Sequence, residues 1–100
     1  MSQEFTIEFT QTAVEQLASY ERRESTIILD AIKTQLRYQA VQEARNRKLL
    51  RENPLADWEL RVGEYRVFYD VDCEQHIARI VAIGHKEHNK LFIAGEEIEL

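Results

Sequence analysis

Two arginines lie in the most strand-like stretch of the chain, residues 59–71, which reads ELRVGEYRVFYDV. Arg61 precedes a turn at Gly63-Glu64, and Arg66 follows it. A guanidinium stays charged at any physiological pH, and a protein does not bury it without a partner. These two side chains therefore need an explanation in a protein this small.

The sequence leaves two roles open for Arg66. It pairs across the strands with a carboxylate such as Glu59 or Asp57, as charged residues on neighbouring strands often do. Alternatively, Arg66, Arg61 and Lys86 converge on a concave face of the sheet and hold a phosphate. Arginine suits that task because its planar fork makes bidentate contacts to phosphate oxygens.

Other residues that could do chemistry lie nearby in the sequence. His85 and His88 could act as acid or base, because imidazole titrates near neutral pH. Their spacing also fits two metal ligands, but without a third ligand the sequence favours loop histidines or partners of a carboxylate. A basic run is either a solvated face or a surface that binds RNA phosphates, and its charged members are Arg45, Arg47, Lys48 and Arg51.

The residues around these positions predict helices first and strands later. Residues 5–9 alternate apolar and polar side chains, which predicts a strand. Two helices follow, the second with Ile28, Ile32 and Leu36 on one face and an end near Tyr38. Residues 39–47 lack a clear pattern, and Asn53-Pro54 predicts a loop.

Three strands then follow in close succession, at residues 58–62, 65–71 and 77–83, which predicts an antiparallel meander. Residues 84–89 are polar, and a last element at residues 91–100 could pair around Ala94-Gly95. The order β-α-α-β-β-β plus a short C-terminal element predicts an α+β fold, with two helices packed on a small antiparallel sheet. We expect a single domain over residues 1–100.

Composition limits the location of the protein and its partners. The chain has 100 residues and a net charge of −5, which argues against indiscriminate binding of nucleic acid. Its longest apolar runs are too short to cross a membrane. The first four residues do not resemble the start of a signal peptide, and Cys73 is the only cysteine. We therefore expect a cytoplasmic protein.

The hairpin at residues 60–69, LRVGEYRVFY, resembles the "LRVGdYRvxY" hairpin of the RelE/ParE toxins of bacterial type II toxin–antitoxin systems. The paired early helices, the Asn53-Pro54 loop and the run IVAIGHK at residues 80–86 are similar to parts of the same family. The resemblance extends over nearly the whole chain and implies a RelE/ParE-like fold. It also implies a protein antitoxin that wraps the toxin near Arg66.

For the mRNA interferase branch, the resemblance implies translation inhibition by RNA cleavage without a metal or other cofactor. The 2′-hydroxyl attacks the adjacent phosphate, on mRNA bound to the ribosome. Arg66 matches the phosphate-binding arginine of the YR motif, and Arg61 lies near a basic position of the preceding strand. Lys86 stands where the family often has arginine, and His85 or His88 is the candidate acid or base.

Three features depart from the nucleases of the family. Phe92 stands about where these toxins carry a tyrosine, and phenylalanine cannot transfer a proton. Glu59 replaces a residue that is often basic, and the chain is acidic. Two alternatives therefore stay open: a ParE-type toxin that inhibits DNA gyrase, and a member without catalysis that only binds its antitoxin.

Overall fold

The computed structural model describes residues 4–100, so the first three residues, on which the signal-peptide prediction partly rests, lie outside it. Its elements run in the order β1 (Thr6–Phe9), α1 (Gln11–Ala18), α2 (Arg22–Gln39), β2 (Arg47–Leu49), β3 (Trp58–Val62), β4 (Tyr65–Asp72), β5 (Ile77–Glu87), β6 (Lys90–Ile93) and β7 (Glu96–Ile98). Two helices pack on a largely antiparallel sheet, which confirms the predicted α+β fold.

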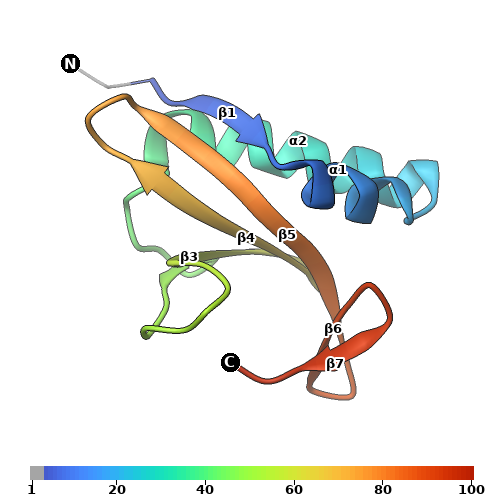
Figure 1. Ribbon diagram of the computed structural model, residues 1–100. Coiled ribbons are helices and arrows are strands. Elements are labelled where there is room, and N and C mark those ends of the chain that lie inside the picture. Colours follow the sequence, from blue (N-terminus) through green and yellow to red (C-terminus); the bar gives the residue numbers. More distant parts are fainter. Residues whose placement is uncertain (1–3) are drawn as a thin grey trace.

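One long strand, β5, organises the sheet. The strands follow the order β2-β3-β4-β5-β6-β7, and all these neighbours are antiparallel. The first part of β5 also pairs in parallel with β1, from Thr6 opposite Ile77 to Phe9 opposite Ile80. Its last part, from His85 to Glu87, pairs with β6. Figure 1 shows β5 running from beside β1 to the hairpin at the C-terminus.

The two helices cover one face of this sheet (Figure 1). Helix α1 begins after Thr10, whose hydroxyl accepts a hydrogen bond from the backbone N–H of Ala13 at 3.1 Å. The apolar stripe predicted for α2 is fully buried. It packs against sheet side chains that include Trp58, Leu60, Val67, Tyr69, Ile80 and Ile83.

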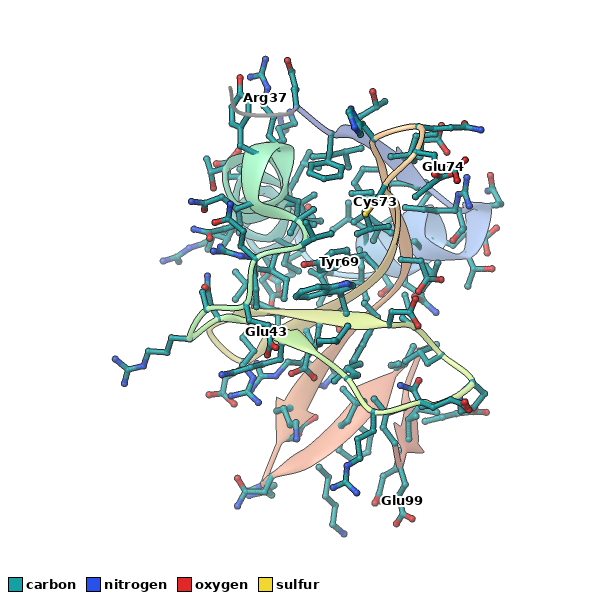
Figure 2. The ribbon with its side chains drawn as sticks, turned by 90° about the vertical axis from the view of Figure 1, so that its left-hand side faces the viewer. Arg37, Glu43, Tyr69, Cys73, Glu74 and Glu99 are labelled. Carbon is teal, nitrogen blue, oxygen red and sulfur yellow. The ribbon has the colours of Figure 1, made fainter. Side chains whose placement is uncertain are left out.

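Trp58 and Tyr69 anchor this helix-side core. Their rings stack with centroids 6.0 Å apart, so Trp58 is a packing residue of the core. The Tyr69 hydroxyl donates to the carbonyl of Ala40 at 2.7 Å, and burial raises the pKa of Tyr69. Figure 2 shows Tyr69 between the helix and the sheet. The tyrosine thereby holds the end of α2 against β4.

A second core lies on the other face of the sheet. There Phe68 is fully buried under the terminal hairpin, which we define as residues 90–98. The turn of this hairpin lies at Ala94-Gly95, as predicted. Both residues have a positive φ, 53° and 80°. The hairpin lies very close to β5, because a Cβ on Gly84 would be 2.4 Å from the carbonyl oxygen of Phe92. Glycine at position 84 is therefore required for this packing.

Two segments differ from the sequence-based expectations. Residues 84–87 continue β5 instead of forming a polar loop, because β6 pairs with them on one side and the Lys86 N–H donates to the Glu64 carbonyl at 2.7 Å on the other. The basic run contains a short strand, β2, that pairs with β3. Among the described residues, no helix is long and apolar enough to cross a membrane.

Candidate functional site

Arg61 and Arg66 occupy directly opposed positions in the β3–β4 hairpin. Opposed residues of antiparallel strands point to the same face, and like charges placed this way destabilise a sheet. Glu59 lies two positions before Arg61 and thus shares this face, as does the buried Phe68 opposite Glu59. The two arginines therefore lie on the side of the sheet away from the helices.

The carboxylate expected for Arg66 pairs with Arg61 instead. Arg61 Nε lies 3.1 Å from Glu59 Oε1, and the exposed fractions of the two side chains are 49% and 9%. Arg66 Nη1 donates to the carbonyls of Gly63 and Tyr65, each at 2.8 Å. Within residues 4–100, Arg66 makes no ion pair, and its buried Nε has no hydrogen-bond partner. Pairing of Arg66 with Glu59 or Asp57 is thus contradicted.

A groove of about 860 Å³ runs beside Arg61 on the same side of the sheet. We call it the basic groove, and its charged lining residues are Arg51, Glu59, Arg61, Lys86, Lys90, Glu97 and Glu99. The structure thus brings three of the predicted site residues, Arg51, Arg61 and Lys86, to one cavity. Arg66 lies on the same face, one strand further, opposite Gly84 of β5.

His85 does not join this groove. Because β5 is extended through this region, His85 and Lys86 point to opposite faces, and His85 turns to the helix side. The Tyr20 hydroxyl lies 2.8 Å from His85 Nδ1, and Glu87 Oε2 lies 3.0 Å from Nε2. Phe92 stacks on the same imidazole with centroids 5.9 Å apart. The predicted acid/base histidine and Phe92 therefore lie together, away from the arginines.

Tyr65 extends this helix-side cluster. Its hydroxyl donates to Glu24, and this hydrogen bond, with a smaller contribution from burial, raises the pKa of Tyr65 to about 12. Burial and the charge of Glu24 also raise the pKa of Tyr20. Both phenols are therefore neutral at physiological pH. These contacts tie Tyr20, which lies between α1 and α2, and the first turn of α2 to β5 and β4.

The basic run is divided by β2. Arg47 is buried, with 5% of its surface exposed, and it donates to the carbonyl of Gln42 at 3.0 Å and to the side chain of Gln35. It therefore lies inside the fold rather than on a solvated or RNA-binding face. Arg45 is exposed, and Lys48 is half-buried opposite Glu59.

His88 occupies the turn between β5 and β6. It is exposed and has a φ of 51°. In the part of the chain that the structure describes, no group of three His, Cys, Asp or Glu side chains could hold a metal ion.

Four charged residues of the groove were not predicted as part of a site, namely Glu59, Lys90, Glu97 and Glu99. Glu59 was considered as a partner of Arg66 and as a departure from the family, although its position two residues before Arg61 is the signal that places both on one face. Lys90 joins the groove because β6 folds back on β5, which no local pattern indicates.

Comparisons with known proteins agree with the fold described above. A family model described as "ParE toxin of type II toxin-antitoxin system, parDE" matches residues 7–90. Among solved structures, the RelBE2 toxin–antitoxin complex of Mycobacterium tuberculosis contains a similar chain, with 25% identity and a TM-score of 0.73. That match covers 84% of this chain and 100% of the other.

Two further structures share the fold at 17% identity. The archaeal RelE–RelB complex of Pyrococcus horikoshii gives a TM-score of 0.67 and covers 86% of this chain and 99% of the other. The isolated RelE toxin of Escherichia coli gives 0.65 and covers 86% and 87%. A search of curated protein sequences found no match.

Proposed function

The chain belongs to the ParE toxin family of type II toxin–antitoxin systems, and from this premise we propose that it is a toxin that binds and cleaves RNA at the basic groove. The observation that carries this proposal is the Arg61–Arg66 pair. Two guanidiniums face each other on one side of the sheet, and only one of them has a carboxylate partner among the described residues. A phosphate between them would relieve their repulsion and accept hydrogen bonds from both.

The groove supplies groups for cleavage by the 2′-hydroxyl. The Glu59 carboxylate takes the 2′-hydroxyl proton as the oxygen attacks phosphorus, and the two arginines stabilise the charge that builds on the phosphate oxygens. The Lys86 ammonium gives a proton to the departing 5′-oxygen. One O–P bond forms and one breaks, so the products are a 2′,3′-cyclic phosphate and a 5′-hydroxyl end.

A second candidate function is inhibition by binding alone, as in a toxin that acts on DNA gyrase. The position of His85 favours it, because this histidine lies on the opposite side of the sheet from the arginines. Glu59 is also held by Arg61. A toxin of this type needs the cationic surface but no group that transfers a proton.

The antitoxin is the partner that we propose for the same surface. Two of the similar structures are complexes of a RelE-type toxin with its RelB-type antitoxin. We propose that an antitoxin made in the same cytoplasm orders a flexible segment over the basic groove and Arg66. A carboxylate of that segment could take the position of the RNA phosphate.

Induction of the toxin alone in a bacterial host tests the RNA proposal. We expect growth arrest together with new RNA 5′-hydroxyl ends, and we expect both to disappear in Arg66→Ala and Glu59→Gln. His85→Ala is the matched control, and it should keep both effects because its side chain faces the helices. Arrest without new ends would support the gyrase alternative, and ends that depend on His85 instead of Glu59 would contradict the assigned base.

A further inference from the structure

The terminal hairpin lies largely beyond the part of the chain that matches the toxin family. The family match ends at residue 90, whereas the hairpin comprises residues 90–98. The similar chain from Mycobacterium tuberculosis is matched over its full length but covers only 84% of this one. Most of the hairpin therefore lies outside the residues that the family model matches.

Packing fixes the hairpin in place. Leu91 and Ile93 are 6% and 8% exposed, and both pack with Phe68 and Ala82 of the sheet. Gly84 allows the backbone of Phe92 to come close to β5. The hairpin therefore buries apolar side chains against the sheet and forms one side of the basic groove.

The terminal hairpin and the residue that follows it bring negative charge to the basic groove. Glu97 and Glu99 line the groove together with Arg61 and Lys86. Glu97 Oε1 lies 3.8 Å from Lys90 Nζ, and both side chains are well exposed, so this pair is weak. Figure 2 shows Glu99 at the end of the molecule formed by the hairpin, far from Glu74.

The charges of the groove are nearly balanced as a result. It contains four basic and three acidic side chains. Glu59 pairs with Arg61 and Glu97 with Lys90, whereas Arg51 and Lys86 form no ion pair within residues 4–100. A groove that tracks a nucleic-acid backbone normally carries an excess of positive charge.

We propose that Glu97 and Glu99 are specificity-determining residues that weaken the hold of the groove on neighbouring phosphates of a nucleic acid. The inference rests on the proposed RNA-binding function. These two carboxylates repel phosphates that flank the one held by Arg61 and Arg66. The toxin thus depends on one well-placed phosphate contact instead of general attraction to polyanions, in keeping with its net charge of −5.

The test compares two double variants of equal net charge. Glu97→Gln/Glu99→Gln removes two carboxylates that line the groove. Glu43→Gln/Glu74→Gln removes two exposed carboxylates outside the groove. The probe is a fluorescent uridine decamer with 2′-O-methyl groups, which cannot be cleaved by 2′-hydroxyl attack. Fluorescence anisotropy would measure the affinity at low and at moderate sodium chloride, and Arg66→Ala would measure the contribution of the phosphate site.

We expect Glu97→Gln/Glu99→Gln to bind the decamer about fivefold more tightly at low salt, with a smaller gain at higher salt. The Glu43/Glu74 control should stay within about twofold of the wild type. An equal gain in affinity in both double variants would show that only the net charge matters, and it would overturn the inference.

The remaining outcomes separate the inference from the proposed function. If the wild type binds through Arg66 but Glu97→Gln/Glu99→Gln binds no better, the inference is wrong and the RNA site stands. If neither the wild type nor this variant binds the decamer, both are wrong. Binding seen only after removal of the two carboxylates would support both.

Discussion

Arg61 and Arg66 lie directly opposite each other across the β3–β4 hairpin, yet within residues 4–100 only Arg61 is paired with a carboxylate, that of Glu59. Two facing cations on a sheet raise the energy of the free protein. The arrangement is most stable when an anion lies between them. This relationship makes the candidate site testable with a simple anion.

Inorganic phosphate should stabilise the wild type and should not stabilise Arg66→Gln. A ligand at ten times its dissociation constant adds about 1.4 kcal/mol to the free energy of unfolding, and such a gain raises the melting temperature of a domain of this size by about 6–10 °C. Thermal unfolding in phosphate, with sodium chloride at equal ionic strength as the control, measures the shift. An equal shift in Arg66→Gln would place the bound anion elsewhere.

Arg61→Ala should destabilise the protein by about 1–3 kcal/mol, because it leaves the nearly buried Glu59 carboxylate without its partner. Glu59→Gln/Arg61→Ala should recover most of this loss, because the amide carries no charge. Urea unfolding of the wild type, both single variants and the double variant gives the coupling energy. Additive losses would show that the pair does not contribute to stability.

Arg47→Ala should lower the free energy of unfolding by about 2–4 kcal/mol, because it removes charge-assisted hydrogen bonds and buried packing between β2 and α2. Arg45→Ala, on the exposed side of the same run, should change stability by less than about 0.5 kcal/mol. Chemical denaturation distinguishes the two. Similar small changes in the free energy of unfolding for both variants would show that Arg47 does not stabilise the fold.

Gly84→Ala should loosen the terminal hairpin and destabilise the fold by about 1–3 kcal/mol, because the new Cβ would collide with the Phe92 carbonyl. Hydrogen exchange should then accelerate at the amides of Leu91–Ile93. Gly63→Ala is the matched control. Its φ of 58° makes alanine unfavourable, but nothing lies within 4 Å of the new Cβ, so exchange in the hairpin should stay slow.

The hydrogen bond between Tyr65 and Glu24 should make stability depend on pH in alkaline solution. Because the pKa of Tyr65 rises to about 12 in the folded protein, the unfolded chain loses this proton first, near pH 10. Its contribution is complete below pH 10 and is lost as the pH rises towards 12. The stability difference between wild type and Tyr65→Phe should therefore shrink from pH 8 to pH 11, whereas Tyr38→Phe, at an exposed position, should show no such trend.

Local patterns predicted much of this fold. The apolar stripe of α2 and its end near Tyr38, the three strands of the meander and the Ala94-Gly95 turn all correspond to observed elements. Each has a short-range cause, such as helical spacing of apolar residues or a residue that accepts a positive φ. The order of these elements predicted the α+β packing, and the similarity to the toxin family implied the same fold.

The long-range pairings were not predictable in the same way. The partner of β1 is β5, some seventy residues later, and no local pattern encodes that choice. The extension of β5 through Gly84 also depends on pairing with β6, and it decides that His85 and Lys86 face opposite sides. Arg47 was misplaced for a similar reason, since its partners Gln35 and Gln42 come from the end of α2 and the turn that follows.

The pairing of β1 with β5 has a consequence for synthesis of the protein (Figure 1). A ribosome releases the chain from its N-terminus, so β1 emerges long before the strand that it must join. The helix-side core cannot close until Ile80 has emerged. A nascent toxin therefore cannot complete this core or its cationic face until β5 and the start of β6 have been made.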